Sequence, residues 1–117
     1  MTATETRERV AYRTVAPSAV AWINGRQAIV ARTDRTGRTS TCEIERGVEP
    51  EGSYLALVVR AIGDRDRVVI LGPSSMRLAL EREYVAIYHR PERLVDVEPA
   101  GLVTADELVD RVRGLAG

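Results

Sequence analysis

The sequence predicts a single α/β domain, in which a three-stranded antiparallel meander continues into a β-α-β-α segment to give the order β-β-β-α-β-α-β-α. Three observations lead to this class. The first part of the chain alternates short β-prone runs with tight-turn residues. The rest alternates apolar runs with stretches of helical periodicity. The chain has 117 residues, 44% of them hydrophobic, which suits one domain with a real core. We therefore expect a mixed, largely five-stranded sheet with helices packed on it.

The first hairpin is predicted from a turn signal between two apolar runs. Residues 19–23 are apolar and β-prone, and Asn24 and Gly25 follow them. This pair often closes a two-residue hairpin, because both residues tolerate positive φ. Residues 26–33 then form the returning strand.

A third strand completes the meander. Residues 34–38 form a second turn, with Gly37 at a position of positive φ. Alternation in residues 39–46 places Cys42 and Ile44 on one face and polar residues on the other.

The next two elements are a helix and a buried strand. Residues 54–63 have apolar residues at helical spacing, with Ser53 as a candidate N-cap and Gly63 as the stop. Residues 64–72 run from a charged turn into four consecutive apolar residues, which is typical of a central strand buried on both faces.

A second helix, a last strand and a third helix close the domain. Residues 74–90 are helical and end before Pro91. Their apolar stripe contains Met76, Leu80, Tyr84 and Ile87. Residues 93–101 form a strand. Residues 104–117 form an amphipathic helix, and its capping box pairs Thr104 with Glu107. Its buried side contains Leu108, Val112 and Leu115.

The composition limits the class of protein. No apolar run approaches the roughly 20 residues that span a bilayer, and the start of the chain has no apolar segment of a secretory signal. The single cysteine excludes an internal disulfide framework. We expect a soluble, cytoplasmic protein without membrane contact. Residues 1–14 are polar and mix both charge signs, so they are expected to be a flexible leader before a domain at 15–117.

Charge is unevenly distributed along the chain. The formal net charge is zero, and all 17 basic residues are arginine. Residues 1–46 hold eight arginines and five acidic residues, whereas residues 47–117 hold nine arginines and twelve acidic residues. This asymmetry indicates a basic face, although an ordinary solvated surface explains it as well.

The meander turns carry the first candidate site. The arginines on or beside them are Arg26, Arg32, Arg35 and Arg38. Guanidinium groups held on a rigid ribbon suit a nucleic-acid backbone. The alternative is a solvated hairpin with no ligand.

The turn after the buried strand is the second candidate site. Gly72 is followed by Pro73, and then Ser74, Ser75 and Arg77 open a helix, whose N-terminus favours an anion such as an RNA phosphate. Plain helix capping by serine is the alternative. A nucleotide-binding P-loop is excluded, because the chain has no lysine.

Residues for catalysis or metal binding are few. His89 is the only histidine and has no partner that the sequence places beside it. Asp96 and Glu98 share a strand face, but a cation site usually recruits more oxygens. Cys42 is predicted to be a buried, inert thiol. We expect no catalytic residue, no metal and no cofactor, and therefore no enzyme.

The order of elements and four motifs carry a family resemblance. The motifs are "AVAWINGRQAIVAR", "DRVVILGPSSMRLALE", "YHRPERLVDVEPAG" and "LVTADELVDRV", which together cover residues 19 to about 115. The chain resembles the middle domain of archaeal and eukaryotic class-one peptide release factors and of the ribosome-rescue factor Pelota. It is also similar to single-domain bacterial relatives of that domain.

The resemblance implies a role in translation, with one departure. Release factors carry a Gly-Gly-Gln tripeptide between the third strand and the first helix, and its glutamine helps water attack the peptidyl-tRNA ester. The corresponding segment here is "ERGVEPEGS", and the only glutamine is Gln27 in the hairpin. Peptide release by that mechanism is therefore not expected. Pelota also lacks the tripeptide, so the resemblance still implies a non-catalytic module that binds the ribosome or RNA, in stress, hibernation or rescue.

Two other functions stay open on the residues alone. The chain would be a protein-interaction or oligomerisation module without an RNA role if strand 39–46 pairs with a protein partner or a second copy. It would be a small phosphate-binding hydrolase if the Gly-Pro-Ser-Ser turn and His89 form a site.

Overall fold

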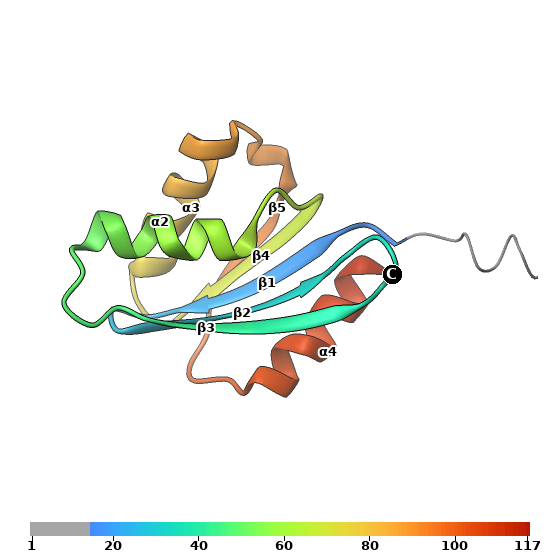
Figure 1. Ribbon diagram of the computed structural model, residues 1–117, viewed down its shortest axis with the longest axis horizontal. Helices are drawn as coiled ribbons and strands as arrows, with labels where there is room; N and C mark the ends of the chain where they lie inside the picture. Colours follow the sequence, from blue (N-terminus) through green and yellow to red (C-terminus); the bar gives the residue numbers. More distant parts are fainter. Residues whose placement is uncertain (1–14) are drawn as a thin grey trace, which may run out of the picture.

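The structure, a computed structural model, describes residues 15–117 as one mixed five-stranded sheet with three helices. The strand order across the sheet is β3-β2-β1-β4-β5, so the first strand in the chain is the central one. Helices cover both faces of the sheet (Figure 1). This is the predicted fold class, with the predicted order of elements. The predicted leader, residues 1–14, lies outside the described residues.

The meander forms as the turn signals predict. Strand β1 (Ser18–Ile23) pairs antiparallel with β2 (Gln27–Thr33), and β2 pairs antiparallel with β3 (Thr39–Glu45). In the first turn, the Asn24 side-chain oxygen accepts hydrogen bonds from the backbone N–H groups of Arg26 and Gln27, at 2.8 and 2.9 Å. Asparagine thus orders the hairpin with its own side chain.

The second half of the sheet is parallel. Strand β4 (Arg67–Gly72) lies beside β1 and β5 (Leu94–Pro99) lies beside β4, both in parallel. The carboxyl ends of β1, β3, β4 and β5 therefore meet at one end of the sheet, which we call the carboxyl edge. The amino ends of the same strands meet at the opposite end, the amino edge.

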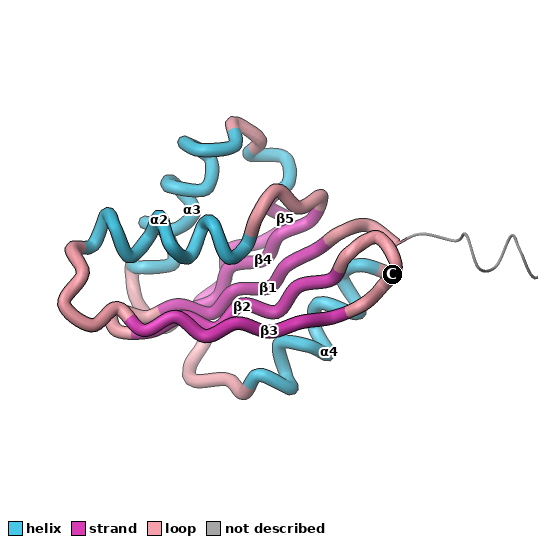
Figure 2. The backbone as a smooth tube through the Cα atoms, viewed as in Figure 1, coloured by secondary structure: helices cyan, strands magenta, loops and turns pink. Residues whose placement is uncertain are grey.

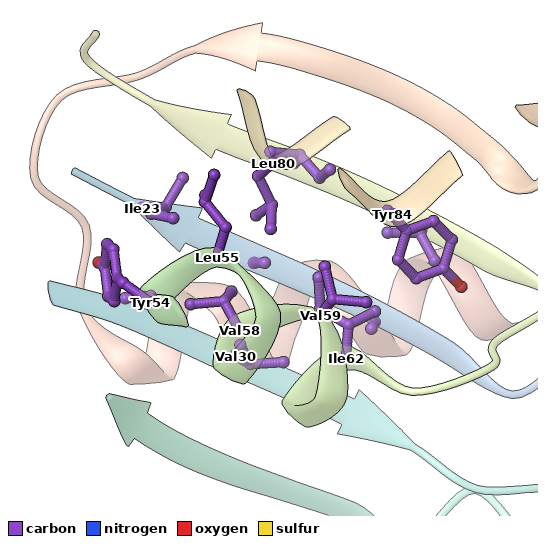
Figure 3. Close-up of a cluster of buried hydrophobic side chains, with 14 residues drawn as sticks. Ile23, Val30, Tyr54, Leu55, Val58, Val59, Ile62, Leu80 and Tyr84 are labelled. Carbon is purple, nitrogen blue, oxygen red and sulfur yellow. The ribbon is translucent and has the colours of Figure 1, made fainter. Parts of the chain in front are cut away.

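Helices α2 (Glu51–Ile62) and α3 (Met76–Tyr88) cover one face of the sheet. Leu55, Val58 and Val59 of α2 point toward the strands (Figure 3). Leu80 and Tyr84 of α3 complete the same buried cluster. These residues recur at helical spacing, and burying that stripe supplies most of the stability of such a helix.

Helix α4 (Ala105–Ala116) covers the other face, as the tube in Figure 2 shows. Leu108 and Val112 pack there against Val20 and Trp22 of β1. The Trp22 ring is 1% exposed, and its indole N–H donates to the Gly101 carbonyl at 2.8 Å. Strand β1 is thus buried on both faces, which explains its unbroken apolar run.

The start of α2 differs from the prediction. The helix begins at Glu51 after Pro50, so Ser53 lies inside the first turn and is not the N-cap. Proline is well placed before a helix, since its φ of −58° is already near the helical value. The Glu51 carboxylate lies near the helix N-terminus, where a negative charge interacts favourably with the helix dipole. These two residues move the helix start three positions upstream of the predicted residue 54.

The second helix is shorter than predicted, and its buried stripe contains Leu80 and Tyr84 as predicted but Tyr88 in place of Ile87. Ile87 is 45% exposed, whereas Tyr88 packs on Tyr84 with ring centroids 4.9 Å apart. The helix ends at Tyr88, and His89 follows in the left-handed conformation with φ of 57°. Residues Pro91–Arg93 form a 3-10 turn, so β5 starts at Leu94 and not at 93.

None of the helices in residues 15–117 is both long and apolar enough to span a membrane.

Candidate nucleic-acid interface

The four arginines predicted on the meander do not form one surface. Arg26 lies in the β1–β2 turn at the carboxyl edge, whereas Arg35 and Arg38 lie in the β2–β3 turn at the amino edge. The seven residues of β2 separate the two turns by about 20 Å. Successive turns of any meander fall at opposite ends of the sheet, so the predicted strands already implied this separation.

Arg32 has a structural role. Its side chain is half-buried on β2, and its Nη1 donates to the carbonyl of Ala61 at 3.0 Å, in the last turn of α2. Beside it, Arg65 donates through Nε to the Ile62 carbonyl at 2.9 Å. The two guanidinium groups satisfy helix carbonyls that have no partner within the helix. Burial, and then the nearby Arg32 charge, lower the pKa of Arg65.

The β2–β3 turn is ordered by one carboxylate. Asp34 Oδ1 accepts hydrogen bonds from the backbone N–H of Thr36 at 2.9 Å, the Thr36 hydroxyl at 2.6 Å, and the backbone N–H of Arg38 at 3.1 Å. The Thr36 hydroxyl bond is the largest cause that lowers the pKa of Asp34. Gly37 has φ of +84°, as predicted. Arg35 and Arg38 are exposed on this fixed turn.

A third arginine joins them from the far end of the chain. The Val15 N–H donates to the Arg35 carbonyl at 3.1 Å, and the Ala16 N–H donates to the Ala116 carbonyl at 3.4 Å, so the turn and the end of α4 flank the same segment. Arg113 Nη2 donates to the Thr39 hydroxyl, next to Arg38, at 3.4 Å.

We call Arg35, Arg38 and Arg113 the arginine corner. Sequence reasoning missed Arg113, because no local pattern links α4 to a turn 75 residues earlier.

The turn after β4 is closed by its own side chains. Arg77 Nη1 donates to the Ser74 carbonyl at 2.7 Å and to the Gly72 carbonyl at 3.4 Å. The Met76 N–H donates to the Ser74 hydroxyl at 3.3 Å, and Ser75 is the N-cap without a side-chain hydrogen bond. The predicted anion site therefore has its serine and its arginine engaged within the turn, which favours the capping interpretation.

A cleft of about 480 Å³ opens at the carboxyl edge between the β1–β2 turn and the loop after β3. Its lining residues are Asn24, Gly25, Arg26, Gln27, Glu45, Arg46 and Gly47. Arg46 is fixed there, since Nε donates to the Glu49 carbonyl at 2.8 Å and its guanidinium lies over the Tyr54 ring at 5.8 Å. The Tyr54 hydroxyl donates to the Asn24 carbonyl at 3.0 Å, and burial raises its pKa to about 12.

The remaining candidate residues are dispersed. His89 is exposed after α3. Glu98 pairs with Arg111 of α4 at 2.5 Å, and its neighbour Asp96 has a raised pKa because of the hydrogen bond between the two carboxyls. Cys42 is half-buried, against the prediction of a buried thiol. Within residues 15–117, no three His, Cys, Asp or Glu side chains gather in a way that suits a metal ion.

Similarity to known proteins is found among solved structures. No family model matches the sequence, and no curated protein is significantly similar to it. The crystal structure of Archaeoglobus fulgidus Pelota matches with a TM-score of 0.63 at 16% identity, over 97% of this chain and 37% of that one. The Thermoplasma acidophilum Pelota protein matches with a TM-score of 0.61 at 18% identity, over 96% of this chain and 38% of that one.

The chain has a Pelota-like fold. It spans less than two fifths of the length of these two Pelota proteins. In this Pelota-like fold the loop between β3 and α2, residues 46–50, lies at the carboxyl edge beside the cleft. The arginine corner lies at the opposite edge, some distance from that loop.

Proposed function

We propose that the chain is a non-catalytic module that associates with the ribosome or its RNA in the cytoplasm, and that it corresponds to the middle domain of Pelota. The observation that supports this function best is the structural likeness to two Pelota proteins over nearly the whole chain. The most direct reading of that likeness is a single domain of a translation factor that acts by binding.

The loop after β3 supports binding over peptide release. Residues 46–50 have the sequence Arg-Gly-Val-Glu-Pro, and Gln27 lies on β2. The glutamine that positions water in release factors therefore has no counterpart at this loop. The loop's own arginine, Arg46, is engaged by the Glu49 and Gly25 carbonyls.

The exposed arginines support RNA as the partner. Counterion release makes arginine contacts with phosphates a general source of affinity for nucleic acids. Arg35 and Arg38 are exposed, and the structure shows no ion pair for their guanidinium groups within residues 15–117. Such groups are free to meet phosphates without first breaking an internal salt bridge.

Sucrose-gradient fractionation of a cell lysate tests this function. We expect the chain to move with a ribosomal fraction at low salt and to leave it at high salt, because phosphate contacts are screened. RNase treatment of the same lysate is the control and should return the chain to the top of the gradient. Sedimentation at the top in low salt, without RNase, contradicts the proposal.

A further inference from the structure

We propose that the arginine corner, made of Arg35, Arg38 and Arg113, is the surface that contacts the phosphate backbone of an RNA duplex. The inference rests on the proposed function and adds to it the face of the domain and the form of RNA that this face contacts. It also separates these three residues from Arg26 and Arg32, which the sequence had grouped with two of them.

The corner is organised before any ligand arrives. The Asp34 side chain holds the β2–β3 turn by three hydrogen bonds, and the Gly37 N–H donates to the Asp34 carbonyl at 3.0 Å. A turn that is already ordered loses less conformational entropy on binding than a flexible one. Arg35 and Arg38 thus extend from a backbone that is already fixed.

The corner carries an excess of positive charge. Asp34 is the acid in the turn and forms no salt bridge with the three arginines within residues 15–117, so its single negative charge offsets only part of their three positive charges. The end of α4 carries a partial negative charge, but Arg67 Nη1 donates to the Leu115 carbonyl at 2.8 Å. Arg67 therefore satisfies one of those carbonyls, and Arg113 remains exposed beside the turn.

An RNA duplex suits this surface better than a single strand. Proteins that bind single strands stack bases on exposed aromatic side chains, whereas a duplex is recognised by its shape and its phosphates. In residues 15–117, Trp22, Tyr54 and Tyr84 are buried, and Tyr88 is half-buried against the hydrophobic cluster under α2 and α3. The described part of the chain offers guanidinium groups at the corner but no stacking platform there.

Titration of the intact chain with a fluorescent RNA duplex, followed by anisotropy at a series of salt concentrations, tests the inference. The variants are Arg35→Ala, Arg38→Ala and Arg113→Ala. Each should weaken binding about threefold or more and reduce the slope of log affinity against log salt by about one. Arg26→Ala is the matched control, because it also removes an exposed turn arginine, but at the opposite edge. It should leave the affinity and the slope unchanged.

A variant with lysine at all three corner positions tests whether the positive charge alone sets the salt dependence of binding. Lysine keeps the positive charge that displaces counterions, so the salt slope should stay as in the unaltered chain. Equal effects of Arg26→Ala and Arg35→Ala, or no binding of the duplex, would overturn the inference.

The same variants in the sucrose gradient tell the two proposals apart. If the corner variants follow the ribosomal fraction just as the unaltered chain does, the inference is wrong and the proposed function stands. If the unaltered chain never enters that fraction, while the corner variants alone lose the duplex, the proposed function is wrong and the assignment of the corner stands.

Discussion

At Gly72 the chain has no room for a side chain. A Cβ atom built there would overlap the backbone carbonyl oxygen of Ile23 on the neighbouring strand. That carbonyl belongs to a buried central strand and cannot move without disturbing the sheet. The glycine therefore permits the close approach of β1 and β4 at the carboxyl edge, and it is needed for packing whatever binds nearby.

Gly72→Ala should lower the free energy of unfolding by about 1–3 kcal/mol, because relieving the overlap requires a backbone shift. Urea unfolding followed by Trp22 fluorescence measures it. Gly52→Ala is the control with the opposite sign. Nothing lies within 4 Å of a Cβ atom there, and alanine favours the helix by up to about 1 kcal/mol. Equal stability of the two variants would contradict this interpretation.

At the scale of single elements, the helix ends show which polar residues are structural. Thr104 is the N-cap of helix α4, and its hydroxyl oxygen accepts a hydrogen bond from the Glu107 N–H at 3.2 Å. Only this half of the predicted capping box forms. The Glu107 carboxylate accepts from the Thr104 hydroxyl at 3.2 Å, whereas in a full capping box it would accept from the Thr104 backbone N–H. Ser75, the N-cap of helix α3, makes no such bond. Two N-terminal hydroxyls that look alike in the sequence therefore differ in what they stabilise.

Thr104→Ala should lower the free energy of unfolding by about 1 kcal/mol, because it removes a hydrogen bond to an unpaired helix N–H group. Ser75→Ala should change it by less than about 0.5 kcal/mol. Parallel urea titrations of the two variants measure the difference. A larger loss for Ser75→Ala would show that its hydroxyl makes a contact that this structure lacks.

The C-terminal end of α2 is stabilised by two arginines of unequal importance. Arg65 donates to the Ile62 and Thr33 carbonyls, at 2.9 and 3.1 Å, and so joins the helix to β2. Arg32 makes one such bond, and its buried Nε has no partner within residues 15–117. Its own contribution is reduced by that unpaired N–H group and by repulsion from Arg65.

Arg65→Ala should therefore lower the free energy of unfolding by about 1–3 kcal/mol, since it leaves two carbonyls without their donor. Arg32→Ala should lower it by less than about 1 kcal/mol. Thermal or urea unfolding measures both. Neither variant should alter the salt slope of duplex binding, and a slope reduced in Arg32→Ala would return this residue to the interface.

At the scale of the whole molecule, one sheet joins two hydrophobic clusters. Leu80 of α3 and Leu108 of α4 lie on opposite faces and are both fully buried. Because β1 contributes to both clusters through alternate residues, neither layer can loosen without exposing the central strand. The domain should therefore unfold as one cooperative unit.

Leu80→Ala and Leu108→Ala should each lower the free energy of unfolding by about 2–5 kcal/mol. In both variants the circular-dichroism and Trp22 fluorescence transitions should coincide. Trp22 reports directly only on the α4 face, so a Leu80→Ala variant in which helix signal is lost before the fluorescence changes would show that the faces unfold separately.

The sequence by itself determined the kind, number and order of the elements. Turn pairs such as Asn24-Gly25, the apolar run of the central strand and the cap at Thr104 act over a few residues, so they can be read along the chain. The same local signals failed at Pro50, where two start signals compete, and at Ile87, where two adjacent apolar residues could each take the buried position.

The tertiary structure alone decided the chemistry of the arginines. Side chains of one type received different roles because their neighbours come from distant segments. Arg32 meets the carbonyl of Ala61 in α2, and Arg77 turns back onto its own turn. Arg35 and Arg38 stay exposed and are joined by Arg113 from the last helix. Periodicity records which face a residue occupies, whereas a site depends on which elements the sheet brings to one edge.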